Sequence, residues 1–252
     1  MKANYLKYKI YIISIIIVLF LSISCSVDHS GYQLTKDELQ KLESKAEHGD
    51  AEACWCLYIY YEEDKEKSIY WLRKGAKYGE RRSQYLLGSL LLQEQSEKEI
   101  IEGLELLKKA AEQGDDTAQE RLGEYYKDGK YISANLKKSE YWYRKSANQG
   151  SLTAMVKLSD ILTANREDRV SLKEAYKWAA IALLRAGTGT SLNREIKQHQ
   201  VDIVEKAKKA NLNIITLKQE AEEQAKIENK RIPKYVGHYD PSLGLKCIEK
   251  AK

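Results

Sequence analysis

The sequence contains very little proline and phenylalanine. Its 252 residues include two prolines, Pro233 and Pro241, so the first 232 residues contain none. Because proline removes a backbone donor and interrupts helices, its absence over this length favours a chain that is helical throughout. There are 18 tyrosines but a single phenylalanine. Because a tyrosine ring carries a polar hydroxyl, tyrosine suits helix contacts and binding surfaces that are partly exposed to solvent.

The patterns of common catalytic and metal sites are also missing. The histidines, His29, His48, His199 and His238, have no cysteine, aspartate or glutamate at metal-ligand spacing, and no zinc-protease helix motif occurs. The sequence has no nucleophile elbow, phosphate-binding loop or dinucleotide fingerprint. We therefore expect a protein that is not an enzyme and that takes no metal, cofactor or small-molecule substrate.

The charge balance argues against nucleic acid as a ligand. The formal net charge is +5, but three of the lysines, Lys2, Lys7 and Lys9, belong to an N-terminal leader, which leaves 39 basic and 37 acidic residues. Phosphate binding needs a concentrated basic face. Lysine and glutamate alternate along this chain instead, which predicts solvated helix faces with local ion pairs.

The start of the chain has the layout of a secretory leader. The three lysines precede an apolar run at residues 10–23, which Ser24 and Cys25 follow. The run is shorter than the roughly 20 residues that a membrane-spanning helix needs. A basic start, an apolar core and a small residue are typical of a cleaved signal. We expect residues 1–24 to be a signal peptide and residues 25–38 a tether; an uncleaved anchor is the alternative.

The end of the leader resembles a bacterial lipobox. In such a site a peptidase cuts before a cysteine that becomes lipidated, and Leu21-Ser22-Ile23-Ser24-Cys25 fits except that Ser22 stands where an aliphatic residue is usual. The resemblance implies lipidation of Cys25, while an ordinary signal peptide with an incidental cysteine is the alternative. Because Ser26 rather than aspartate follows, it also implies a periplasm-facing lipoprotein of the bacterial cell envelope, held at the outer membrane.

One sequence pattern recurs along the middle of the chain every 35 or 36 residues, except that Ala53 and Ser83 are 30 residues apart because the first repeat has a short linker. It ends one helix, turns at a glycine and starts the next helix. The turn glycines are Gly79, Gly114 and Gly150; the second-helix series is Trp71, Leu106, Trp142 and Trp178; the small residues that open each first helix are Ala53, Ser83, Ala118 and Ala154. Self-similarity at this period indicates stacked helix pairs. Each pair needs its neighbours to bury its apolar stripe, and each end of the stack needs a cap.

The third copy of this repeated pattern carries residues typical of a known repeat family. Its residues are Ala118, Leu122, Gly123, Tyr126, Gly129, Trp142, Lys145 and Ala147. This pattern resembles the Sel-one-like repeat (SLR), a relative of the tetratricopeptide repeat. The resemblance implies an all-α fold, a right-handed α-solenoid of about four helix-turn-helix repeats with a C-terminal helical cap. We expect the repeats at residues 39–187, capping helices at 188–230 and an irregular tail at 231–252.

Three cysteines remain beyond the leader. Cys54 and Cys56 lie two residues apart on a predicted helix and point in different directions, so they cannot easily bridge each other. An odd number in an oxidising compartment suggests one bridge and one free thiol. A bridge from Cys247 would join the tail to the first repeat at the opposite end of the array. Since repeats contact only their neighbours, we expect instead that the three cysteines are small buried hydrophobic residues.

The predicted binding surface is the inner side of the solenoid. In arrays of this type the first helices line the concave side. Large apolar groups on such a surface suggest a partner site, unless curvature or the C-terminal helices cover them. The residues predicted to bind a partner are Trp55, Ile59, Tyr85, Leu92, Glu120, Glu124 and Met155.

The resemblance also implies a role. SLR lipoproteins include immunity proteins that neutralise phospholipase effectors of type VI secretion, so we expect a protein partner of the lipase-toxin kind. A periplasmic scaffold or regulatory adaptor of envelope proteins fits the same features. A cell-wall or β-lactam hydrolase is a further alternative. It is disfavoured because the cysteine spacing of the cysteine-rich relatives is missing here.

Overall fold

A computed structural model of the chain describes residues 34–94, 96–164, 166–187, 189–234 and 247. The predicted signal peptide, the lipidation site at Cys25 and most of the predicted tail lie outside these residues. The described part of the chain is helical without any strand, as predicted. Its eleven helices are α2 (Lys36–Glu47), α3 (Ala51–Tyr60), α4 (Lys65–Lys77), α5 (Arg81–Leu91), α6 (Glu97–Glu112), α7 (Asp116–Asp128), α8 (Leu136–Asn148), α9 (Leu152–Ala164), α10 (Arg169–Arg185), α11 (Ser191–Lys209) and α12 (Ile214–Arg231).

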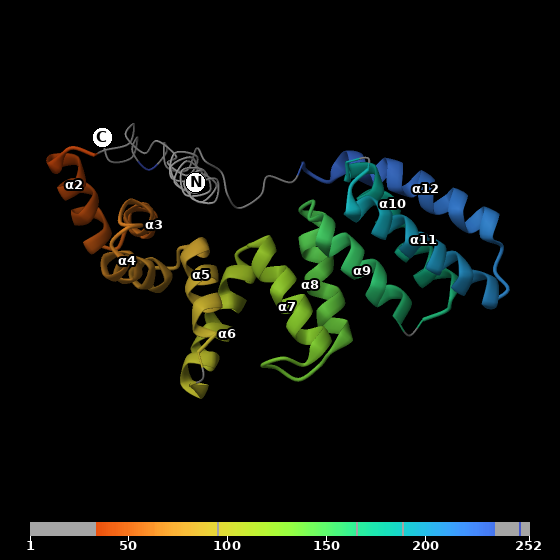
Figure 1. Cartoon of the computed structure of the whole chain (residues 1–252), viewed down its shortest axis with the longest axis horizontal. Coiled ribbons are helices and arrows are strands. Elements are labelled where there is room, and N and C mark those ends of the chain that lie inside the picture. Colours follow the sequence, from red (N-terminus) through yellow and green to blue (C-terminus); the bar gives the residue numbers. More distant parts are fainter. Residues whose placement is uncertain (1–33, 95, 165, 188, 235–246, 248–252) are drawn as a thin grey trace, which may run out of the picture.

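The helices stack as successive pairs along the long axis of the molecule (Figure 1). Four pairs, α3/α4, α5/α6, α7/α8 and α9/α10, form the repeats, and each second helix packs on the first helix of the next pair. Helix α2 packs on α3 as the second helix of a preceding repeat would. The prediction of an α-solenoid of helix pairs is confirmed.

The junctions between repeats share one local design. Glycine ends each second helix in the left-handed region, where a side chain would be strained; the φ values are 97° at Gly49, 88° at Gly79, 91° at Gly114 and 100° at Gly150. The residue directly after each glycine caps the following helix, because its side chain accepts a hydrogen bond from a backbone amide. These caps are Asp50, Glu80, Asp115 and Ser151. Helix α2 starts at a capping box between Thr35 and Glu38, three residues before the predicted start of the repeat region.

Two buried glutamines tie neighbouring repeats together. Gln84 and Gln119 occupy equivalent places on α5 and α7, one residue after the small residue of the repeat. Each side-chain amide donates to an alanine carbonyl of the preceding second helix, and each side-chain oxygen accepts from a glutamine at the end of its own second helix. The contacts are Gln84 to Ala76 (3.2 Å), Gln113 to Gln84 (2.7 Å), Gln119 to Ala111 (2.9 Å) and Gln149 to Gln119 (2.9 Å).

Small residues allow the two helices of a repeat to approach closely. In the third repeat the Ser139 hydroxyl donates to the Gly123 carbonyl at 2.6 Å. A Cβ atom at Gly123 would lie 2.9 Å from ring atoms of Tyr143. The fourth repeat reverses the donor, since the Ser159 hydroxyl of α9 donates to the Ala175 carbonyl of α10 at 2.7 Å.

The last two helices cover the C-terminal end of the stack. Helix α12 packs along α10 and has few contacts with α11. Its buried stripe is Leu217, Ala221 and Ala225. Ion pairs flank this stripe, among them Arg169–Glu220 (2.7 Å), Lys173–Glu220 (3.2 Å) and Lys177–Glu228 (3.0 Å). No helix in the described part of the chain is long and apolar enough to cross a membrane.

Candidate functional site

The candidate site is the surface formed by consecutive first helices, here called the first-helix face. We define it by the residues two and six places after the small residue of each repeat. On α3, α5 and α7 these positions hold five of the predicted binding residues, Trp55, Ile59, Tyr85, Glu120 and Glu124. All five side chains are half-buried, so the stacking of repeats brings them to one surface without covering them completely.

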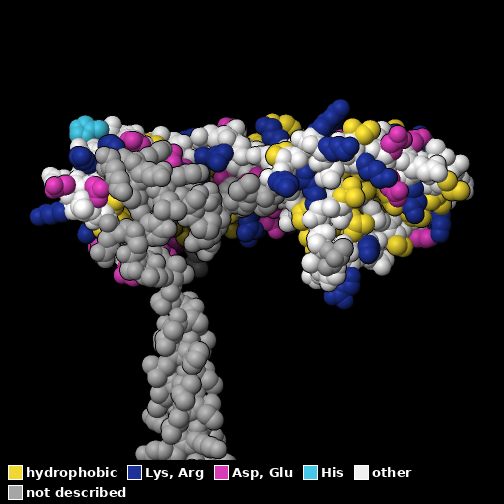
Figure 2. Space-filling model, turned by 90° about the horizontal axis from the view of Figure 1, so that it is seen from above, with side chains coloured by type: hydrophobic (Ala, Val, Ile, Leu, Met, Phe, Trp, Pro, Cys, Tyr) yellow, Lys and Arg dark blue, Asp and Glu magenta, His cyan; other side chains and the backbone are white. Residues whose placement is uncertain are grey.

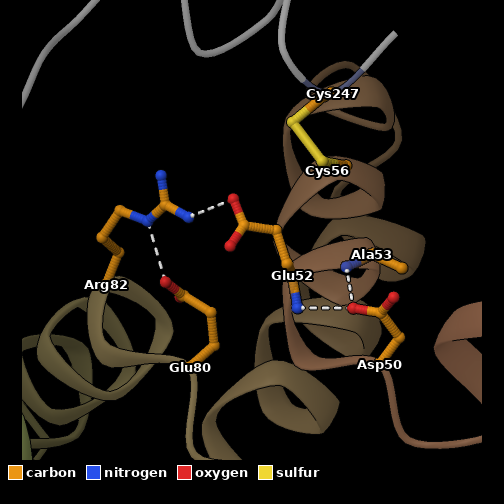
Figure 3. The surroundings of a disulfide bond; sticks show 7 residues. All are labelled: Asp50, Glu52, Ala53, Cys56, Glu80, Arg82 and Cys247. Carbon is orange, nitrogen blue, oxygen red and sulfur yellow. Dashed lines mark hydrogen bonds and ion pairs between the residues drawn. A yellow bond between two sulfur atoms is a disulfide. The ribbon is translucent and has the colours of Figure 1, made fainter. Parts of the chain in front are cut away.

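At the N-terminal end of this face, an arginine stacks on a tryptophan. The Arg82 guanidinium lies 4.7 Å from the centroid of the Trp55 ring. The Tyr58 ring also packs against Trp55, at a centroid distance of 5.1 Å. Figure 3 shows how Arg82 is oriented by two carboxylates, Glu80 (2.8 Å) and Glu52 (3.2 Å). Since Glu52 belongs to α3 and Arg82 to α5, the pair also fixes the spacing of these helices.

The middle of the face combines an ion pair with a tyrosine cluster. Arg121 and Glu124 of α7 are paired at 3.2 Å, and about half of each side chain is exposed. Tyr125 meets Tyr131 edge to face at 5.1 Å, and burial raises the pKa of Tyr125. Tyr131 has a left-handed backbone (φ 63°). Solvent-accessible arginine and tyrosine are the residue types that contribute most to binding energy at protein interfaces.

Glu120 has a structural role in addition to its place on the face. Its carboxylate accepts hydrogen bonds from the Ser151 and Ser146 hydroxyls, at the turn between α8 and α9. Burial raises the pKa of Glu120, against the opposing effect of the Ser151 hydrogen bond. The carboxylate therefore joins the third repeat to the fourth and is less available to a partner than Glu124.

Two predicted binding residues are buried, and their assignment to an open surface is wrong. Met155 has no exposed surface and Leu92 is 3% exposed. Met155 lies one place after the small residue Ala154, and the equivalent residues Cys54, Gln84 and Gln119 are buried too. The residue in phase with Trp55 is Val156, which is 5% exposed. Leu92 is covered because the loop after α7 folds over it, where the Tyr131 hydroxyl donates to the Leu92 carbonyl at 2.7 Å.

Sequence reasoning missed several residues that complete the face. Arg82 immediately precedes the small residue Ser83 and is equivalent to Glu52, so opposite charges at this position of adjacent repeats could have indicated the ion pair. Tyr125 lies seven residues after Ala118, on the same side of α7 as Arg121. The contact of Tyr131 depends on a loop conformation that no periodic pattern predicts.

The expectation for the cysteines is corrected. Cys56 and Cys247 form a disulfide, with their Cα atoms 5.3 Å apart and a sequence separation of 191. Cys54 is free and buried. Repeat stacking alone would keep the tail away from α3, but the chain beyond α12 is long enough to return to the first repeat.

One constellation has the composition of a hydrolytic triad. His199 of α11 lies 2.8 Å from the Ser159 hydroxyl and 3.2 Å from the Asp160 carboxylate. The hydroxyl proton of Ser159 is already donated to the Ala175 carbonyl, and the side chain is fully buried. Ser159 is therefore not placed to act as a nucleophile; these contacts fix α11 against α9. The described residues contain no group of three or more histidine, cysteine or acidic side chains that could hold a metal ion.

The remaining surface of the molecule has a different character. Figure 2 shows hydrophobic side chains mixed with lysine and arginine over the part that holds the C-terminal helices. The exposed large hydrophobic residues of α10, α11 and α12 are Val170, Leu184, Val201, Ile215 and Ile227. They come from three different helices.

Comparison with known proteins agrees with the repeat architecture. The family model described as Sel1 repeat matches residues 58–79, 81–115 and 117–151. The uncharacterized protein YibG of Escherichia coli (strain K12) is 28% identical over 146 residues, which cover 57% of this chain and 74% of that protein. A sel1-like repeat-containing protein of Acanthamoeba polyphaga mimivirus is 31% identical over 115 residues, covering 44% of this chain and 22% of that protein.

A solved structure shows the same fold. It is the crystal structure of a protective antigen, present in uropathogenic Escherichia coli strains, that displays an SLR fold. The TM-score is 0.56 and the identity 23%, over 80% of this chain and 45% of that one. This chain thus spans less than half of the antigen, and the likeness concerns the fold alone. Three consecutive stretches of this chain thus match the Sel1 repeat model, and the observed helix pairs have the SLR fold.

Proposed function

We propose that this protein is a cell-envelope protein that captures another protein on its first-helix face. Sel1 repeat proteins typically mediate protein–protein interaction. The observation that carries the proposal is the row of aromatic and arginine side chains on consecutive first helices, Trp55 and Arg82, then Tyr85, then Arg121 and Tyr125. Tryptophan, tyrosine and arginine are the residues enriched at the energetic centres of interfaces.

The location outside the cytoplasm is supported by two independent features. The N-terminal sequence has the pattern of a secretory leader ending at Cys25. The Cys56–Cys247 bridge is of a kind that persists in oxidising compartments and is rare in the cytosol. Lipidation of Cys25 would then hold the solenoid at the membrane, facing the periplasm.

The partner in this proposal is a phospholipase effector of type VI secretion, which the protein neutralises. It rests on the resemblance of the repeats to SLR proteins, which include lipoproteins with that role. The Ser159 hydroxyl donates its proton to the Ala175 carbonyl, which favours binding over hydrolysis at the constellation of Ser159, Asp160 and His199. A scaffold for envelope proteins would use the same face.

The test is capture followed by an activity assay. Full-length protein, extracted from membranes of its native strain in mild detergent, should retain a phospholipase in stoichiometric amount. The purified protein should then inhibit lipid hydrolysis by that enzyme. Retention of envelope or cell-wall proteins instead would establish the scaffold role and end the effector proposal.

The anchoring part of the proposal is tested separately. Replacing Cys25 by alanine (Cys25→Ala) removes the thiol to which the lipid would be attached, so the variant should move from the membrane fraction to the soluble periplasmic fraction. A variant that stays with the membrane would refute lipid anchoring at Cys25. Because the solenoid is unchanged, this variant should still capture the partner.

A further inference from the structure

The Cys56–Cys247 bridge joins two parts of the molecule that repeat stacking would leave apart. Cys56 lies on α3 in the first repeat, whereas Cys247 follows α12, which packs on α10 of the last repeat. In an array whose repeats contact only their neighbours, the first and last repeats do not touch, so such a bridge connects the two ends directly. Any change at the bridge therefore affects the first repeat without acting through the helices between.

The first repeat is the weaker end of the array. Its cluster of buried residues is small and includes both bridge cysteines: Leu42, Ala46, Ala53, Cys54, Cys56, Leu57, Trp71 and Cys247. The cluster at the other end draws on five helices, from α8 to α12. Terminal units with few buried contacts are the first to open in repeat proteins. The bridge thus adds a constraint at the end that needs it most.

The same helix carries part of the first-helix face. Trp55 precedes Cys56 on α3, and Glu52 of α3 pairs with Arg82 of α5 at 3.2 Å (Figure 3). Arg82 in turn stacks on the Trp55 ring. If α3 becomes disordered, both the stacked pair and the spacing between α3 and α5 are lost.

We propose that the Cys56–Cys247 disulfide is a redox-sensitive clasp that keeps α2 and α3 ordered, so that the first-helix face is complete only in the oxidised protein. A dithiol reductant would break the sulfur–sulfur bond, leave a thiol on each cysteine and itself become a disulfide, in a transfer of two electrons and two protons. Cys56 is 2% exposed and Cys247 8%, so a reductant reaches the bridge mainly when this end of the molecule opens.

The third cysteine of the repeat body stays outside this exchange. The Cys54 thiol is buried and donates to the Ala46 carbonyl at 3.7 Å. Burial raises its pKa to about 11, so it remains a thiol at neutral pH, whereas exchange requires a thiolate. Cys54 is therefore the natural control position.

Hydrogen–deuterium exchange of the full-length protein tests the clasp. On reduction with dithiothreitol, backbone amides of α2 and α3 should exchange at least ~10-fold faster, while those of α9 to α12 stay unchanged. Cys247→Ser without reductant should show the same pattern, and dithiothreitol should change it no further. Cys54→Ser in the oxidised state should match the wild type.

Two results would overturn the proposal. One is equal exchange of α2 and α3 in oxidised and reduced wild-type protein, a comparison that needs no substitution and so stands even if a variant fails to fold. The other is a non-reduced digest without a linked pair of peptides containing Cys56 and Cys247. The statement about the first-helix face rests on the proposed function, but the exchange experiment needs no partner, so the two can fail separately.

Discussion

Residues at equivalent positions of the repeats differ in a way that localises the binding surface. The place two residues after the small residue holds Trp55, Tyr85, Glu120 and Val156 in turn. The first two are half-buried aromatic side chains, the third is hydrogen-bonded across a junction, and the fourth is buried. At this position of the repeat the aromatic side chains lie on α3 and α5, and partner binding is expected to depend most on those helices.

Replacing Ser83 by alanine should stabilise the protein. Ser83 is fully buried, and its hydroxyl has no hydrogen-bond partner among the described residues. The equivalent residues Ala53, Ala118 and Ala154 show that alanine fits this place. Removing a buried unsatisfied hydroxyl should raise the free energy of unfolding by about 1 kcal/mol, measured by urea denaturation. A loss of stability would mean that the hydroxyl is hydrogen-bonded, for instance by a buried water.

Glu120→Gln should make the stability of the protein less sensitive to pH. Burial raises the pKa of Glu120 in the folded state, so the folded state holds the proton more tightly than the unfolded state. Wild-type protein therefore loses stability as pH rises from the unfolded pKa through the folded one. Glutamine keeps an oxygen for Ser151 and Ser146 but carries no charge. The variant should be the more stable protein at pH 7, and the difference should vanish near about pH 3, where the carboxyl is protonated in both states. Urea denaturation at both pH values checks this.

An unchanged difference between pH 3 and pH 7 would contradict the assignment. It would show that packing or hydrogen-bond geometry, not the charge of Glu120, separates the two proteins. Glu124→Gln is the matched control, because Glu124 is on the same helix but faces its partner Arg121 with about half of its side chain exposed.

At the scale of helices, the glutamine contacts explain how repeats of unlike sequence keep one register. Each glutamine side chain donates to a carbonyl at the end of the preceding helix, which also accepts the amide of the turn glycine. Each glutamine side-chain oxygen accepts from a glutamine that follows its own second helix. The first and fourth repeats lack this arrangement, because Cys54 and Met155 occupy the position. The junctions at the start of α5 and α7 are consequently the ones held by glutamine contacts, whereas the junction before α9 uses Glu120 and its two serines.

Gln119→Met, which copies the residue of the fourth repeat, tests this. It should lower the free energy of unfolding by about 1–2 kcal/mol, because the Ala111 carbonyl loses one of its two donors and the Gln149 side-chain amide loses its acceptor. In a double-mutant cycle with Gln149→Ala, the two losses should be less than additive by about 1 kcal/mol. Additive losses would show that the two side chains do not interact.

The positions of the helices were largely predictable from the sequence, whereas the residues that each helix exposes were not. The recurring glycines and small residues give the helix pairs because each glycine adopts the left-handed turn that ends a helix. The binding residues were counted from the same pattern, and a slip of one residue placed Met155 on the surface. One residue is a rotation of about 100° on a helix. The in-phase residue Val156 is buried as well, so α9 has no open side chain at this position of the repeat.

At the scale of the whole molecule, the disulfide is the main feature that the pattern did not predict. Repeat periodicity describes contacts between neighbours, and the bridge spans 191 residues. The packing of α12 on α10 instead of α11 was equally unpredictable, since it depends on side-chain pairs such as Lys177–Glu228. Both features involve a segment beyond the last repeat, where no family pattern guides the prediction.

Loss of the bridge should lower global stability. Closing a loop of 191 residues removes conformational freedom from the unfolded chain that corresponds to about 5 kcal/mol in the chain-entropy model, as an upper figure. Cys247→Ser should therefore unfold at clearly lower urea concentration than Cys54→Ser. Equal midpoints for the two variants would mean that the bridge adds no net stability.

The central claim is that the first-helix face binds a protein partner, and a matched pair of variants tests it most directly. Trp55→Ala with Tyr85→Ala removes two aromatic residues from this face. Tyr70→Ala with Tyr141→Ala removes two exposed tyrosines from the second helices α4 and α8. Circular dichroism should first show that both pairs retain the helical fold.

Capture from the native strain, quantified by mass spectrometry, is the measurement to make. The account predicts one stoichiometric partner retained by the wild type and by the Tyr70/Tyr141 pair, and retained at least ~10-fold less by the Trp55/Tyr85 pair, as loss of interface hot spots entails. Equal retention by both pairs, or greater loss with the second pair, would contradict it.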